Sequence, residues 1–237
     1  MIFNRLKHYY IVLYNLDMTK LTDKKYILFD LDGTLTDSYP AITTSFLYAV
    51  QGYERASFTE DELSSIIGPP LKDSFMRLLG VDGFEAWELV KKYREYYNAG
   101  GMYNCKVYQG IEVLLKELSN NGYKVVVATS KPEVQAIKVL SHFGLDKYFT
   151  LIAGDDENCS RANKKDVITY CLNRLGSPSV QEVVMVGDRK YDMIGAKELG
   201  ITAIGVTYGY GSHSELSSSG ADFIVNNANE LKELFLL

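Results

Sequence analysis

The sequence predicts an α/β fold in which a parallel sheet is covered by helices on both faces. Two observations predict it. From residue 110 onward, short apolar segments alternate with helical patterns, as expected for strands that are buried on both faces. Between Thr36 and Val107 there is no strand pattern, and about seventy residues show only helical periodicity. We therefore expect a small helical unit inserted between the first strand and the rest of the sheet.

The expected elements follow from hydrophobic periodicity and from turn residues. A first strand is predicted over residues 26–30. The inserted unit has helical patterns over residues 38–51, from Thr59 onward, 71–79 and 84–97, with a break at Gly68-Pro69-Pro70. The remaining helices are expected over 110–120, 133–142, 164–175 and 191–199, alternating with strands over 123–128, 149–153, 182–186 and 201–206, before a final short strand and helix within 222–237.

These patterns predict three parts. Residues 1–22 are expected to form an N-terminal extension outside the fold, and Met18 is a candidate start. Residues 23–37 and 106–237 form the α/β core, and residues 38–105 form the helical unit. The extension faintly resembles a signal peptide, but its apolar part is short and has no small-residue cleavage site.

Composition restricts the possible partners and compartments. The 237 residues carry a net charge of −5 and no basic run, which argues against nucleic acid or an anionic membrane surface as a partner. No apolar run is long enough to span a membrane. Three scattered cysteines, without a Cys-x-x-Cys pair, favour a reducing compartment and argue against a zinc site. We expect a cytoplasmic protein, either a monomer or a weak homodimer.

The most informative segment is the end of the first strand, where Asp30 and Asp32 follow an apolar run and Gly33 permits a turn. Residues two apart in an extended chain face the same side, about 6.5 Å apart. This separation allows two aspartates to flank one small group such as a phosphoryl group. The alternative is a polar turn that only ends a core strand, and the other strand ends must decide between the two.

Further polar residues follow the other strands. The second strand ends in Thr129-Ser130-Lys131, and the fourth ends in Gly187-Asp188-Arg189-Lys190-Tyr191-Asp192. Open parallel sheets bind ligands beyond the carboxyl ends of their strands, so these groups are expected to meet. Asp30 and Asp188 are suitable Mg²⁺ ligands, and Asp192 is placed to hold water ligands of the metal. Asp32 is a candidate general acid and base, and Thr129 and Lys164 are candidates to bind phosphoryl oxygens.

This set of motifs resembles the haloacid dehalogenase-like hydrolases. Residues 30–38 (DLDGTLTDS) resemble the first motif of that superfamily, residues 128–132 (ATSKP) the second, Lys164 the third and residues 187–192 (GDRKYD) the fourth. The resemblance extends from about residue 24 to 237 and implies a Rossmann-like core. It also implies a Mg²⁺-dependent phosphatase that acts on a small phosphorylated metabolite through an aspartyl-phosphate.

The resemblance also implies roles for individual residues. It makes Asp30 the nucleophile and a metal ligand, and Asp32 the general acid and base as well as a metal ligand through its backbone carbonyl. Asp188 is the remaining carboxylate ligand, and Thr129, Ser130 and Lys164 bind phosphate. The third motif departs from the commonest Lys-Pro form and is similar to a 5′-nucleotidase-like branch. Lys165 is therefore an alternative to Lys164, although motif register favours Lys164.

The inserted helices resemble the small α-helical cap of phosphoglycolate phosphatase-like members. Gly68 and Pro69 would then belong to a substrate-specificity loop, the alternative being a simple helix-breaking turn. Expected substrates are phosphoglycolate or a nucleoside 5′-monophosphate, and a β-phosphoglucomutase-like sugar-phosphate mutase is the alternative activity. A phospho-aspartate receiver is disfavoured by the long insertion, and dehalogenation or phosphonate cleavage by the acid at Asp32. Residues 205–211 (GVTYGYG) lack dinucleotide-binding spacing, so we expect a flexible loop there.

Overall fold

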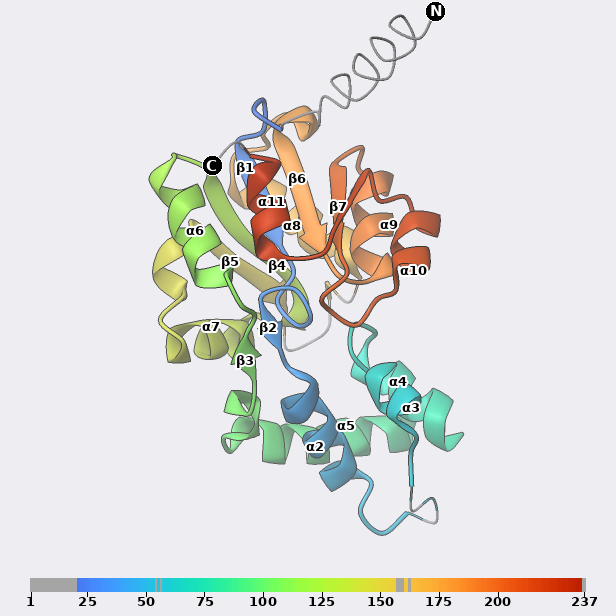
Figure 1. The fold of residues 1–237 in the computed structure, drawn as a ribbon. Helices are drawn as coiled ribbons and strands as arrows, with labels where there is room; N and C mark the ends of the chain where they lie inside the picture. The colour runs from blue at the N-terminus through green and yellow to red at the C-terminus, as the bar shows by residue number, and fades with distance from the viewer. Residues whose placement is uncertain (1–20, 54, 56, 157–159, 162, 236–237) are drawn as a thin grey trace, which may run out of the picture.

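The computed structural model describes residues 21–53, 55, 57–156, 160–161 and 163–235. Its main sheet has six parallel strands in the order β5-β4-β1-β6-β7-β8 (Figure 1). The strands are β1 (Tyr26–Phe29), β4 (Lys124–Pro132), β5 (Leu151–Asp155), β6 (Val183–Gly187), β7 (Thr202–Val206) and β8 (Phe223–Val225). The predicted α/β fold is confirmed, and β1 lies at the centre between β4 and β6.

Alternation along each central strand divides the core into two layers. In β1, Ile27 and Phe29 pack on one face of the sheet, whereas Leu28 packs on the other. Both sets are fully buried, so the strand contains hardly any polar side chain before Asp30. This explains why the strand reads as a continuous apolar run in the sequence.

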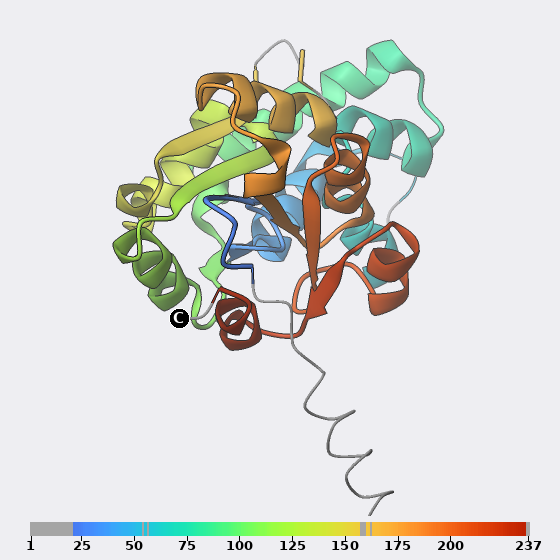
Figure 2. The same cartoon turned by 90° about the horizontal axis from the view of Figure 1, so that it is seen from above.

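Helices cover both faces of the sheet, as Figure 2 shows. One layer contains α6 (Ile111–Asn120), α7 (Glu133–His142) and α11 (Ala228–Glu233), and the other contains α8 (Lys164–Arg174), α9 (Lys190–Glu198) and α10 (His213–Ser218). Short 3₁₀ turns lie at η2 (Asp146–Tyr148) and η3 (Val180–Glu182). The expected helices are present, and α10 is an addition: Ser212 caps it by accepting from Glu215 N, and Leu216 anchors it in the core.

The inserted segment forms a second group of helices beyond the carboxyl ends of the strands (Figure 1). It contains α2 (Tyr39–Ala49), α3 (Glu60–Ser64), α4 (Leu71–Leu79), α5 (Gly83–Asn98) and η1 (Gly101–Tyr103). Its own apolar cluster includes Phe46 and Phe75, whose rings stack with centroids 4.8 Å apart. A two-stranded antiparallel ladder of β2 (Thr36–Asp37) and β3 (Lys106–Val107) joins it to the core.

Two details differ from the sequence-based expectation. β4 runs on to Pro132, so Thr129, Ser130 and Lys131 lie in an irregular strand end rather than after it. Leu21, assigned to the N-terminal extension, is buried, and its N–H donates to Leu234 O at 2.7 Å. Residues 1–20 and Cys159 lie outside the described part of the chain. Within that part, the helices are all too short or too polar to cross a bilayer.

Candidate active site

The predicted site residues meet at the carboxyl ends of three neighbouring strands. Asp30 follows β1, Thr129 lies near the end of β4, and Asp188 follows β6. The last ladder bond between β1 and β6 runs from Asp30 N to Val186 O at 2.9 Å. Since the backbone of Asp30 is held by the sheet, its carboxylate has a fixed position, with Oδ1 accepting from Leu31 N at 2.7 Å.

Gly33 lets the loop after β1 approach Asp188 closely. Its φ is +87°, and a Cβ at this position would lie only 2.2 Å from Asp188 Oδ2. Thr34, the next residue, donates its hydroxyl hydrogen to Asp188 Oδ1 at 3.2 Å. The glycine in the motif is therefore required both by the backbone conformation and by the space that Asp188 occupies.

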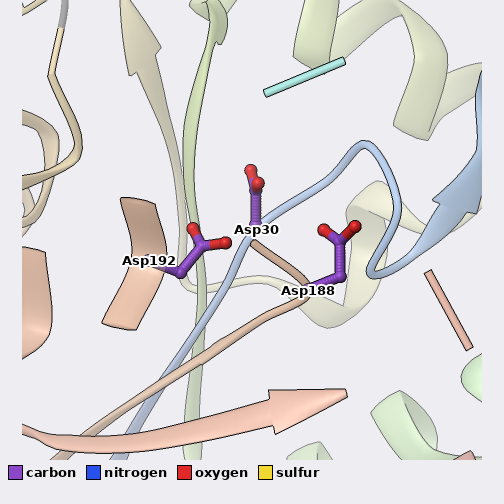
Figure 3. A group of neighbouring side chains, drawn as sticks. All are labelled: Asp30, Asp188 and Asp192. Atoms are coloured by element: carbon purple, nitrogen blue, oxygen red, sulfur yellow. The ribbon is translucent and has the colours of Figure 1, made fainter. Parts of the chain in front are cut away.

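Three buried carboxyl groups gather around one small space (Figure 3). Oxygen atoms of Asp30, Asp188 and Asp192 all lie within 4.8 Å of one another. Asp188 and Asp192 are fully buried, and Asp30 is 7% exposed. Asp192 reaches the group from the first turn of α9, four residues after Asp188. Like charges at this separation, away from water, repel strongly and require a compensating cation.

Lys164 supplies part of that compensation. From the start of α8 its ammonium group reaches Asp30 Oδ1 at 2.9 Å and Asp192 Oδ1 at 2.8 Å, and it donates to Ala128 O at 3.0 Å. Burial alone would lower the pKa of Lys164, but Asp192 and Asp30 together raise it above the ordinary value. Lys165 points elsewhere and pairs with Glu198 at 3.3 Å on the surface, so the structure brings only Lys164 of the two to the cluster.

One lysine does not neutralise three carboxylates. Burial, followed by the charges of Asp192 and Asp30, raises the pKa of Asp188 well above its ordinary value. Burial also raises the pKa of Asp192 to about 6; Lys164 opposes this shift and Asp30 adds to it. Within the described residues, the hydrogen-bond donors to the Asp188 carboxylate are neutral: the hydroxyl group of Thr34 and the N–H of Tyr210. Hard oxygen atoms with excess negative charge fit a divalent cation such as Mg²⁺.

Asp32 lies apart from this trio and has its own two donors. Ser38 donates its hydroxyl hydrogen to Asp32 Oδ1, and Lys131 forms an ion pair with Asp32 Oδ2. Sequence reasoning assigned no role to Ser38 or to Lys131. Ser38 is the last residue of the first motif, and Lys131 follows Thr129 and Ser130 in the second. Their positions within these motifs are the sequence feature that could have indicated a role in the site.

A cavity of about 300 Å³ separates these residues from the helical unit. Asp30, Asp32, Thr129 and Ser130 line it from the core, and the predicted loop residues Gly68 and Pro69 line it from the helical unit. Its other walls are largely apolar and aromatic with a few polar groups, and include Ile42, Ile66, Lys72, Trp87, Val90, Tyr93, Arg94, Tyr97, Gln135 and Asp155. This shape suits a small molecule with one strongly polar end.

Arg189 and Tyr210 are among the side chains that connect the core to the helical unit. Arg189 donates to Ile67 O, next to Gly68, and pairs with Glu215 at 2.9 Å. Tyr210 donates its backbone N–H to Asp188 Oδ2, and its hydroxyl group contacts Asp37 and the N–H groups of Ser38 and Tyr39. The segment 205–211 was expected to be a flexible loop. Through Tyr210 it instead forms hydrogen bonds with Asp188 of the acidic cluster and with residues 37–39 at the N-terminus of α2.

Comparison with known proteins places the chain in a family. The family model of the haloacid dehalogenase-like hydrolases matches residues 27–206. The chain is a haloacid dehalogenase-like hydrolase. A 5′-nucleotidase of Pseudomonas aeruginosa is 41% identical over 193 residues, which cover 80% of this chain and 86% of the nucleotidase. The tyrosine-protein kinase PtkA of Mycobacterium tuberculosis is 38% identical over 210 residues, 87% of this chain and 71% of the kinase.

Solved structures agree with this assignment. The crystal structure of a predicted phosphatase from Clostridium acetobutylicum superposes with a TM-score of 0.86 at 43% identity, covering 90% of this chain and 98% of that one. The predictions of the family, of the α/β fold and of a phosphatase-type hydrolase are confirmed. This haloacid dehalogenase-like hydrolase therefore belongs among enzymes that cleave phosphate esters.

Proposed function

We propose that this hydrolase is a Mg²⁺-dependent phosphatase that cleaves a small phosphomonoester through an aspartyl-phosphate on Asp30. The observation that carries the proposal is the position of Asp30. Its carboxylate faces a cavity of about 300 Å³, with the buried acidic cluster and Lys164 beside it and Asp32 lining the same cavity. A nucleophile, an acid–base group and a cation site thus converge on one space, as phosphoryl transfer requires.

The reaction has two steps. In the first, a carboxylate oxygen of Asp30 forms a bond to phosphorus, the bond from phosphorus to the leaving oxygen breaks, and Asp32 gives that oxygen a proton. In the second, Asp32 takes a proton from water, the water oxygen forms a bond to phosphorus, and the bond from phosphorus to the Asp30 oxygen breaks, which releases inorganic phosphate. Asp30 is regenerated as a carboxylate, and the protons balance because Asp32 gives one and takes one.

Other residues hold the phosphoryl group. Thr129 and Ser130 line the cavity beside Asp30 and are suited to donate hydrogen bonds to phosphoryl oxygens, and Lys164 adds a positive charge. Asp30, Asp188 and the backbone carbonyl of Asp32 would hold Mg²⁺, with Asp192 orienting its surroundings. When bound, Mg²⁺ would neutralise negative charge on the phosphoryl oxygens.

The helical unit over residues 38–105 would act as a cap that selects the substrate. Gly68 and Pro69 line the cavity opposite Asp30, which supports a role in specificity over a plain helix break. The aromatic walls and the similarity to a 5′-nucleotidase support a nucleoside 5′-monophosphate, and phosphoglycolate remains the smaller candidate. A sugar-phosphate mutase would use the same residues and would return an isomerised sugar phosphate without releasing phosphate.

Product analysis tests this function. The purified protein is incubated with Mg²⁺ and a set of phosphomonoesters, and inorganic phosphate and sugar-phosphate isomers are both measured. We expect continuous phosphate release that stops when the metal is chelated. Asp30→Asn should abolish release while the fold persists, and Asp23→Asn, which changes an exposed carboxylate, should leave release unchanged. Retained turnover in Asp30→Asn would refute the nucleophile, and isomerisation without release would favour the mutase.

A further inference from the structure

Each aspartate of the Asp30-Leu31-Asp32 segment has its own buried lysine. Lys164 pairs with Asp30, whereas Lys131 pairs with Asp32 Oδ2. The side chains of Lys131 and Asp32 are 6% and 14% exposed, so water hardly screens this pair. The two lysines come from different elements, the end of β4 and the start of α8, and they contact different carboxylates.

Lys131 is itself held firmly in place. Its backbone N–H donates to Thr129 Oγ1 at 3.2 Å, and its ammonium group lies 5.2 Å from the centre of the Tyr97 ring on α5. Within the described part of the chain, Asp32 is the carboxylate with which Lys131 forms an ion pair. Ser38 donates its hydroxyl hydrogen to the other carboxylate oxygen of Asp32, Oδ1, at 2.5 Å. The carboxylate of Asp32 is thus fixed by one donor on each oxygen.

A purely structural explanation accounts poorly for this arrangement. Burying an ammonium and a carboxylate costs desolvation energy that the pair barely recovers, so such a pair is weak evidence for stability. Lys131 and Asp32 also line the cavity, where any group that fixes the direction of Asp32 affects the reaction. The ion pair with Lys131 and the hydrogen bond from Ser38 together fix the direction in which the Asp32 side chain points, and this direction matters when Asp32 takes a proton from water in the second step.

We propose that Lys131 is a positioning residue that orients the Asp32 carboxylate for deprotonating water during hydrolysis of the aspartyl-phosphate. This rests on the proposed function, because it assigns Lys131 to one step of that reaction. In this role Lys131 acts through its ion pair with Asp32 rather than by binding the substrate. The first step, with a leaving group that needs no proton, should proceed without it.

The test separates the two steps with p-nitrophenyl phosphate, whose leaving group departs without a proton. In Lys131→Met we expect kcat to fall about tenfold or more, because a misplaced base slows the second step. The value of kcat/KM, which reports the first step, should stay within about threefold, so KM falls together with kcat. Acid-quenched enzyme examined by intact-mass spectrometry should carry one phosphoryl group on most molecules.

Additional variants make the result specific. Lys131→Arg keeps a cation and should recover part of kcat, and Ser38→Ala should show the same pattern more weakly, because Lys131 remains. Asp32→Asn should show the pattern most strongly, and adding Lys131→Met to it should cause no further loss. Lys165→Met removes an exposed lysine of the neighbouring helix and should leave every parameter unchanged. Thermal melting of each variant verifies that it is folded.

Several outcomes would overturn the proposal. If kcat and kcat/KM fall together in a folded variant, Lys131 acts in the first step, and if the variant melts at a much lower temperature, Lys131 has a structural role. If KM rises while kcat is unchanged, Lys131 binds substrate. Further loss in the Asp32→Asn background would show that Lys131 does not act through Asp32. If the wild-type protein hydrolyses no phosphomonoester, the proposed function fails and this proposal falls with it, whereas an active wild-type protein with any of the other outcomes refutes the role of Lys131 alone.

Discussion

Replacing Tyr210 by phenylalanine should destabilise the protein, because the substitution removes one hydroxyl group together with its hydrogen bonds. That oxygen accepts from Ser38 N at 2.7 Å and from Tyr39 N at 2.9 Å, and its hydrogen is donated to Asp37 Oδ1 at 2.9 Å. Burial, and then the neighbouring groups, raise the pKa of Tyr210, so the hydroxyl keeps its proton throughout the neutral range. All its hydrogen-bonding capacity is used.

The magnitude follows from these three contacts. A hydrogen bond contributes about 1 kcal/mol net, so losing three should cost about 3 kcal/mol. For a chain of this length, 1 kcal/mol corresponds to about 3 °C in Tm, and we expect a drop of about 9 °C. The backbone N–H that Tyr210 donates to Asp188 is kept in the phenylalanine variant, so Mg²⁺ should stabilise the variant as much as the wild-type protein.

Tyr208→Phe is the matched control. Among the described residues the Tyr208 hydroxyl makes a single hydrogen bond, to Thr34 O at 3.0 Å, so its loss should cost about 1 kcal/mol and about 3 °C. Urea unfolding and thermal melting of both variants, without metal, measure the difference. If Tyr210→Phe is no more destabilising than Tyr208→Phe, the hydrogen bonds of the Tyr210 hydroxyl do not stabilise the N-terminus of α2 as the structure indicates.

Three further predictions concern the acidic cluster. Lys164→Met should destabilise the metal-free protein by about 3–5 kcal/mol in urea unfolding, because buried carboxylates lose their cation; Lys165→Met is the control, and equal effects would contradict the assignment. Because the folded-state pKa of Asp192, about 6, exceeds its ordinary 3.8, the metal-free fold should lose stability as pH rises from 4 through 6. The Mg²⁺-induced gain in Tm should therefore grow over this range, and a gain independent of pH would refute the argument. Gly33→Ala should lower Tm and weaken Mg²⁺ stabilisation, since its Cβ would lie 2.2 Å from Asp188 Oδ2, and a wild-type response would show that the loop can move away.

Local sequence was sufficient to predict most elements and to place Asp30 and Asp188 at the ends of strands. Apolar strands that end in Asp30 and Asp188 are visible in the sequence because a strand buried on both faces admits hardly any polar side chain before its end. Lys164 was favoured over Lys165 by motif register, and only the structure brings it to the acidic cluster. The short helix α10 was missed, because six residues carry too little periodicity and depend on one buried leucine.

Long-range contacts were beyond sequence reasoning. Lys131 meets Asp32 across 99 residues of chain, and Tyr210 meets Ser38 across 172. Neither contact leaves a local pattern, because a lysine in a polar strand end or a tyrosine between glycines is common where no long-range contact exists. The strand order, which makes β1 the neighbour of both β4 and β6, is what places these segments at one edge.

The sequence by itself therefore determined the fold class, the family motifs and the positions of carboxylates at the strand ends, because short runs of polar and apolar residues are enough to indicate all three. The tertiary structure decided which oxygen each lysine contacts, how the helical unit closes a cavity over Asp30, and which loop holds Asp188. These features depend on packing between segments far apart in the chain, and only the folded arrangement of the sheet brings them together.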